Sequence, residues 1–288
     1  MRHALFATAV VAGLLAAPAP VRAAGAPAVS APLVIGETFT MPSEVLHESR
    51  RINVYFPPGF SAASDSALPV LVMPDGGLAE DFLHVAGLIE VSVGNGTMRP
   101  WLLVGIENTE RRRDMTGPTA NPRDRKIAPH VGGSQPFRDF IRSELMPEVR
   151  RRYRTTSESG IVGESLAGLF VIETFLREPD LFGTYIAFDP SLWWNDRGLV
   201  TDEAALLAAH ARAGRTLFMA TSSEPGIVTD ARAFDSTLVA AKVPGLRYQY
   251  VPFPAETHGT IYHPAALRAF RAVLSAPDNS LGDRPGSR

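Results

Sequence analysis

The chemistry of this chain centres on Ser165, which lies in the segment Gly163-Glu164-Ser165-Leu166-Ala167-Gly168. A strand-like run at 159–162 precedes it, and a helix-like run at 168–177 follows. A serine on such a sharp turn presents its hydroxyl, and small flanking residues let the crowded backbones approach. The residues two before and two after the serine are small, although Ala167 stands where glycine is usual. The segment therefore predicts a nucleophilic serine.

A serine hydroxyl is a poor nucleophile at neutral pH and needs a base, which on a strand-turn-helix scaffold follows the serine and the acid in chain order. His258 follows the last strand-like run, and Gly259 leaves space beside its imidazole. His263 is the alternative, but it begins the final helix-like run beside Pro264, where a surface or capping role is more ordinary. We expect His258 to be the base.

The third member should be a carboxylate that orients the imidazole. Glu224 follows the penultimate strand-like run, where the chain order favours the acid. Asp189, which follows the preceding strand-like run, is the alternative acid, and Asp230 and Asp235 lie on the next helix-like segment. A Ser/His pair without a strong acid is also open.

Two backbone amides are candidates for an oxyanion hole. The turn at 74–78 contains Gly77, whose amide can face an open site without a side chain in the way, and Leu166 directly follows the serine. Paired amides of this kind stabilise the negative oxygen that forms when an ester carbonyl is attacked. The alternative for the glycines is an ordinary turn.

Two further groups of residues are candidates for substrate binding. Arg111 and Arg113 could place a guanidinium beside an anionic or catecholate-like group, and a solvated or internally paired charge run is the alternative. Trp193 and Trp194 could form an aromatic wall near the serine or belong to the core. No metal-ligand spacing is present, so we expect no metal and no cofactor.

Apolar runs and helix-period segments alternate along the chain, which predicts an α/β fold with a mostly parallel central sheet and helices on both faces. The strand candidates are 52–56, 70–73, 101–106, 160–162, 185–188, 216–220 and 248–252. The helix candidates are 79–91, 137–153, 167–177, 201–213, 230–241 and 264–274. In such sheets the ligand lies beyond the carboxyl ends of the strands, where the residues above are found.

The N-terminal end is typical of an exported protein. Residues 1–23 combine a basic start, an apolar run and small residues at a cleavage site, which predicts a signal peptide. The apolar run is shorter than the roughly 20 residues of a membrane span, so we expect no stable membrane insertion after cleavage. The chain has no cysteine, hence no disulfide, and a periplasmic or secreted location is expected.

The remaining organisation follows from composition. We expect a lead-in with a first strand region at 24–47, one catalytic domain at 48–276 and a flexible tail at 277–288. The formal net charge of -2 gives no support for nucleic-acid binding. A small molecule is the expected partner, and the oligomeric state is open.

Several spaced motifs resemble one known family. They are Gly105-Ile106-Glu107-Asn108-Thr109, Arg111-x-Arg113-Asp114, Gly163-x-Ser165-Leu166-x-Gly168-Leu169-Phe170, Asp189-Pro190-Ser191-Leu192-Trp193-Trp194 and Thr257-His258-Gly259. Together they resemble the putative-esterase branch of the α/β-hydrolases, which includes ferri-siderophore esterases and esterase D and is more distantly similar to the mycobacterial mycolyltransferases. The resemblance runs from about Arg50 to Leu274.

This resemblance implies an α/β-hydrolase fold and a serine carboxylic-ester hydrolase that forms an acyl-enzyme, acting on a siderophore ester or another small acyl ester. By resemblance Ser165 is the nucleophile, His258 the base, and Gly77 and Leu166 the oxyanion donors. Some siderophore esterases are thought to work with a Ser/His dyad, which leaves the role of Glu224 open. Acyl transfer to a sugar or lipid alcohol and a non-catalytic binding protein on the same scaffold are the alternatives.

Overall fold

The computed structural model describes residues 30–275, so the predicted signal peptide and the tail at 277–288 lie outside the described residues. The chain divides into two compact units, and the second, Ile35–Arg288, holds every helix and strand described below. Within residues 30–275, no helix combines the length and the apolar character that crossing a bilayer requires.

The described strands form one eight-stranded sheet in the order β1-β2-β4-β3-β5-β6-β7-β8. The strands are β1 Glu37–Ser43, β2 Glu48–Tyr55, β3 Leu68–Pro74, β4 Leu102–Ile106, β5 Thr155–Glu164, β6 Thr184–Phe188, β7 Thr216–Thr221 and β8 Arg247–Pro252. The β1-β2 and β2-β4 pairs are antiparallel, and every other neighbouring pair is parallel. The mostly parallel sheet expected from the sequence is confirmed.

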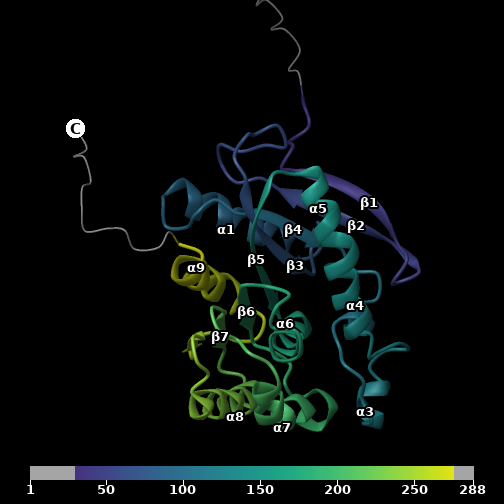
Figure 1. Ribbon diagram of the computed structural model, residues 1–288, viewed down its shortest axis with the longest axis vertical. Helices are drawn as coiled ribbons and strands as arrows, with labels where there is room; N and C mark the ends of the chain where they lie inside the picture. The colour runs from purple at the N-terminus through teal and green to yellow at the C-terminus, as the bar shows by residue number, and fades with distance from the viewer. Residues whose placement is uncertain (1–29, 276–288) are drawn as a thin grey trace, which may run out of the picture. The chain divides into compact units, whose positions relative to one another are not determined.

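Helices cover both faces of this sheet (Figure 1). They are α1 Phe82–Gly94, α2 Arg111–Asp114, α3 Pro122–Arg125, α4 Ser134–Phe140, α5 Met146–Arg152, α6 Leu166–Arg177, α7 Trp194–Ala209, α8 Pro225–Ala241 and α9 Tyr262–Val273. The helices α1 and α9 pack together on one face, and α4 to α8 pack on the other. The edge of the sheet at the carboxyl ends of the parallel strands is not covered by these two helix layers, and the loops that follow the strands form the expected ligand site there.

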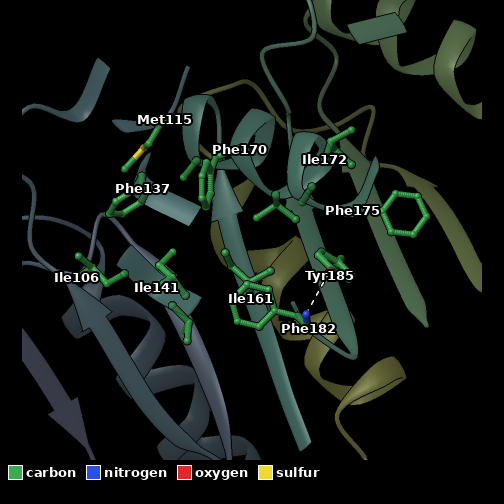
Figure 2. Packing of buried hydrophobic residues seen from close by; sticks show 14 of the residues in the cluster. Ile106, Met115, Phe137, Ile141, Ile161, Phe170, Ile172, Phe175, Phe182 and Tyr185 are labelled. Carbon is green, nitrogen blue, oxygen red and sulfur yellow. Dashed lines mark hydrogen bonds between the residues drawn. The ribbon is translucent and has the colours of Figure 1, made fainter. Parts of the chain in front are cut away.

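The two faces follow from the alternation of side chains along each strand. In β3, Val70 and Val72 point to the core under α4 to α8, whereas Leu71 and Met73 point to the core under α1 and α9. Figure 2 shows the larger core, where aromatic rings from the helices pack over the sheet. Because both faces are buried, the central strands are mostly apolar and buried along their whole length, as β3 and β6 illustrate.

Several helix boundaries differ from the sequence prediction, and two of the differences have clear local reasons. The segment expected as one helix at 137–153 contains a π-helical turn at Ile141–Leu145. This turn ends two residues before Pro147, which has no backbone N–H to donate. Helix α7 was expected to begin at Thr201. Its first turn carries the left-handed residues 195–197, so regular helical geometry starts only after them.

Candidate active site

Ser165 occupies the sharp turn between β5 and α6 that its sequence context predicts. Its backbone has φ 60° and ψ -115°, a conformation that a residue with a side chain adopts only under strain. A Cβ added to Gly163 would lie 2.7 Å from Ala167, and one added to Gly168 would lie 2.8 Å from the carbonyl oxygen of Phe188. The turn therefore requires both glycines and accommodates Ala167 at the position where glycine is usual.

His258 lies in the loop between β8 and α9, and it reaches both Ser165 and a buried carboxylate. Its Nε2 is 3.1 Å from the Oγ of Ser165, and its Nδ1 is 3.0 Å from an Oδ of Asp189. The tautomer that satisfies both contacts has its proton on Nδ1, which donates to Asp189. Nε2 is then free to accept the proton of the serine hydroxyl. The arrangement has the connectivity of a Ser-His-Asp triad.

Asp189 is held rigidly at the end of β6. Its side chain is fully buried, and its other carboxylate oxygen accepts a 2.6 Å hydrogen bond from the backbone amide of Ser222. Its own amide donates to the carbonyl of Ala220. The residue has φ 41°, a left-handed conformation that aspartate tolerates better than most residues.

Glu224, the acid favoured by chain order, occupies a different position. It is the N-cap residue of α8, and its amide donates to the hydroxyl of Ser222. Within residues 30–275, the side-chain hydrogen bonds of His258 go to Ser165 and Asp189 and not to Glu224. The geometry therefore favours the alternative, Asp189, as the carboxylate partner of the imidazole.

The two candidate oxyanion donors differ in their surroundings. Leu166 is the first residue of α6, where a backbone amide has no carbonyl partner within the helix. Gly77 follows β3, which is adjacent and parallel to β5, so its turn lies at the same sheet edge as Ser165. The amide of Gly77 donates a 2.7 Å hydrogen bond to a carboxylate oxygen of Glu80, a contact that the sequence does not indicate.

Both candidate arginines are engaged in ion pairs within the chain. Arg111 makes a bidentate pair with Asp75, at 2.7 and 2.8 Å, and thereby braces the turn that carries Gly77. Arg113 contacts Glu48 and Asp114. Both arginine side chains therefore form ion pairs within the chain, which is the alternative to substrate binding that the sequence left open.

The tryptophans occupy the loop that follows Asp189. The amide of Ser191 in this loop donates to the carbonyl of Ser165, so the loop lies against the serine turn. Trp194 is buried and donates from its indole nitrogen to the carbonyl of Gly117, which makes it a core residue. Trp193 is 40% exposed and stays a candidate for the aromatic wall.

A second carboxylate lies beside the imidazole. An oxygen of Glu164 is 3.4 Å from the Nδ1 of His258 and, among the described residues, has no hydrogen-bond partner. Burial, together with the neighbouring Asp189, raises the pKa of Glu164 to about 7, although the His258 charge opposes this shift. The pKa of His258 is itself raised, chiefly by its hydrogen bond to Asp189 and further by Glu164. One side-chain nitrogen or oxygen atom from each of Glu164, Asp189 and His258 lies within 4.8 Å of the other two.

Replacing Glu164 by glutamine is expected to move the acidic limb of the kcat/KM profile to lower pH. His258, the expected base, must be neutral to accept a proton from Ser165, and a nearby negative charge favours the protonated imidazole. Removing that charge lowers the pKa of His258, and the effect is limited because the Glu164 carboxyl, with a pKa of about 7, is itself partly protonated near neutral pH. The profile is measured on a soluble ester between about pH 5 and 9.

Glu158→Gln is the matched control, because Glu158 lies on the same strand but is exposed and paired with Arg99. Its profile should coincide with that of the unmodified protein. A limb that stays in place in Glu164→Gln, or moves to higher pH, would contradict the electrostatic role assigned to Glu164.

Comparison with known proteins places the chain in a family of esterases. The family model described as "Putative esterase" matches residues 43–254. The ferri-bacillibactin esterase BesA of Bacillus subtilis is 30% identical over 207 residues, which cover 67% of this chain and 70% of that protein. The iron(III) salmochelin esterase of Escherichia coli is 25% identical over 55% of this chain, and the match spans only 36% of that longer protein.

Solved structures agree with this grouping. An IroE-like serine hydrolase from Shewanella oneidensis superimposes with a TM-score of 0.74 and 29% identity, over 83% of this chain and 80% of that one. The BES protein from Bacillus cereus also gives a TM-score of 0.74, with 21% identity over 86% of this chain and 99% of that one. These likenesses and the sheet order confirm the predicted α/β-hydrolase fold.

Proposed function

Since this chain belongs to the putative esterase family and is an ester hydrolase, we propose that it works as a serine hydrolase through an acyl-enzyme on Ser165. The observation that carries the proposal is the 3.1 Å contact between the Oγ of Ser165 and the Nε2 of His258, with Asp189 hydrogen-bonded behind the ring. A hydroxyl placed this way can lose its proton to the imidazole as it attacks.

In the first half of the reaction, the Oγ of Ser165 bonds to the ester carbonyl carbon while its proton passes to Nε2 of His258. The carbonyl oxygen becomes an oxyanion, to which the amides of Leu166 and Gly77 would donate. When the tetrahedral intermediate collapses, the bond to the alcohol oxygen breaks, and His258 gives its proton to the leaving alcohol. The acyl group then remains on Ser165.

In the second half, water attacks the acyl carbon and passes one proton to Nε2 of His258. Collapse of this second intermediate releases the carboxylic acid and returns the proton to Ser165. The role of Asp189 throughout is to keep the imidazole in the productive tautomer and to stabilise its charged form. The ester and one water molecule balance these steps, and Ser165 and His258 return to their starting states.

The substrate that we propose is an ester of the siderophore type. The printed names of the relatives support this choice, since they include esterases of ferri-bacillibactin, iron(III) salmochelin and triacetylfusarinine C. The sequence-predicted leader at residues 1–23 would place such an activity in the periplasm or outside the cell.

We expect the purified protein to release p-nitrophenol from short acyl esters. We also expect it to cleave an ester-linked ferri-siderophore into its hydroxy-acid pieces, which liquid chromatography and mass spectrometry would detect. An amide-linked siderophore of the same iron-binding chemistry is the matched control and should survive. Cleavage of simple esters without cleavage of any ester siderophore would remove the substrate proposal and leave the serine mechanism. Acyl products formed only with an added alcohol would favour acyl transfer.

A further inference from the structure

The amide of Gly77, one of the two expected oxyanion donors, already donates a hydrogen bond to the side chain of Glu80. We propose that Glu80 gates the oxyanion hole, with its carboxylate bound to the Gly77 amide in the resting protein and displaced when the substrate oxyanion forms. This inference rests on the proposed serine mechanism and adds to it a residue that controls access to transition-state stabilisation.

The Glu80 carboxylate is bound by backbone amides from two adjacent strand ends. One of its oxygens accepts from the amide of Gly77 at 2.7 Å, and the other accepts from the amide of Asn108 at 3.3 Å. These amides follow β3 and β4, which are parallel neighbours in register at Pro74 and Ile106. The site therefore holds an anion between two loops at the catalytic edge of the sheet.

The bound carboxylate resembles what an oxyanion hole is built to hold. Amide donors stabilise a developing oxyanion from about 2.7 to 3.1 Å, and the Gly77 contact of 2.7 Å already has this length. Hydrogen bonds from an amide to a carboxylate are also stronger than those between neutral groups. A donor engaged in this way cannot assist the reaction until the carboxylate leaves it.

Glycine at position 77 is what permits the contact. A Cβ added there would lie 2.9 Å from the carboxylate carbon of Glu80 and 3.0 Å from Glu107. Any side chain at this position would push the carboxylate away from the amide. The glycine thus serves both occupants of the amide, the resting carboxylate and the substrate oxygen.

The turn keeps its shape without the Glu80 side chain. Backbone hydrogen bonds from Gly76 to Ile106, from Glu80 to Gly77 and from Asp81 to Asp75 close it, each at 2.9 to 3.0 Å. The side chain of Asn53 also donates to the carbonyl of Gly76 at 2.8 Å. Removing the carboxylate should therefore free the Gly77 amide without unfolding the turn. A change in rate in such a variant then reports on access to the amide and not on a loss of turn structure.

The test compares Glu80→Ala and Glu80→Gln with the unmodified protein on a small p-nitrophenyl ester. Freeing one amide from a competing hydrogen bond is expected to raise kcat/KM by about 3- to 10-fold in Glu80→Ala. Glu80→Gln keeps the side-chain shape but loses the charge, so its rate should lie between the two. Glu107→Ala is the control, since Glu107 lies near Gly77 without bonding to its amide.

A second readout uses acetate as a probe of the vacated amides. Acetate should inhibit Glu80→Ala competitively and leave the unmodified protein unaffected at the same concentration and ionic strength. Melting temperatures within a few degrees of one another would show that the variants are folded.

The proposal that Glu80 gates the oxyanion hole is overturned if folded Glu80→Ala has an unchanged or reduced kcat/KM and is not inhibited by acetate. Should Glu80→Ala fail to fold, the decision passes to Glu80→Gln, where an unchanged or reduced rate has the same meaning. Failure of the underlying mechanism looks different, because the unmodified protein would then hydrolyse no ester or would do so without Ser165.

Discussion

The variant Ser165→Ala is expected to lose roughly 1,000-fold or more in kcat/KM on a p-nitrophenyl ester. The hydroxyl is the group that bonds to the acyl carbon, and the oxyanion donors alone leave only residual catalysis over water. Because alanine fits the same turn and leaves the flanking glycines in place, the melting temperature should change little. Initial rates and thermal unfolding, measured on the same preparation, check both parts.

Ser157→Ala is the control for this experiment, since Ser157 lies on the same strand as Ser165 but is exposed at its far end. It should retain full activity. Hydrolysis by a folded Ser165→Ala at the rate of the unmodified protein would contradict the proposed mechanism outright.

The second large effect is expected for Asp189→Asn, with a loss of about 100- to 10,000-fold in kcat/KM. The asparagine oxygen can still accept from the Ser222 amide, which directs its NH₂ group at Nδ1 of His258. Nδ1 then has to accept a hydrogen bond, so the proton moves to Nε2, where it blocks transfer from Ser165. Steady-state kinetics on the folded variant measure the loss.

Glu224→Gln distinguishes the two candidate acids. With Asp189 bonded to His258 and Glu224 at the start of α8, the Glu224 variant should lose far less activity than Asp189→Asn. The reverse order of effects would return the acid role to Glu224. Near-normal activity in both variants would indicate that the Ser/His pair works without a strong acid.

The sequence predicted the architecture well because both layers of this fold leave a periodic signal. Apolar runs mark strands buried on both faces, and helix-period segments lie between them. All seven strand candidates correspond to strands β2 to β8. The boundaries of α7 were less accurate, because the left-handed residues 195–197 carry no periodic signal of their own.

The carboxylate that contacts His258 was harder to predict, because its position depends on strand order and register. In the sheet, β6 lies directly beside β5, and Glu164 is in register with Phe188, so Asp189 emerges next to Ser165. The strand β7, which precedes Glu224, is one position further away. Chain order alone cannot distinguish these two strand ends.

Partner choice among charged side chains was equally outside the reach of the sequence. Arg111 is paired with Asp75, which is 36 positions away and belongs to the loop after another strand. The Glu80 contact joins residues only three positions apart, yet depends on the backbone geometry of the turn that carries Gly77. Such contacts follow from the fold and not from local pattern.

The most direct test of the serine mechanism is covalent labelling with a fluorophosphonate, followed by intact mass and peptide mapping. We expect one phosphonyl adduct per chain, carried by Ser165, with no labelling of Ser165→Ala and parallel loss of esterase activity as the adduct forms. A protein that hydrolyses esters but takes up no label, or carries it on a serine other than Ser165, would contradict the account.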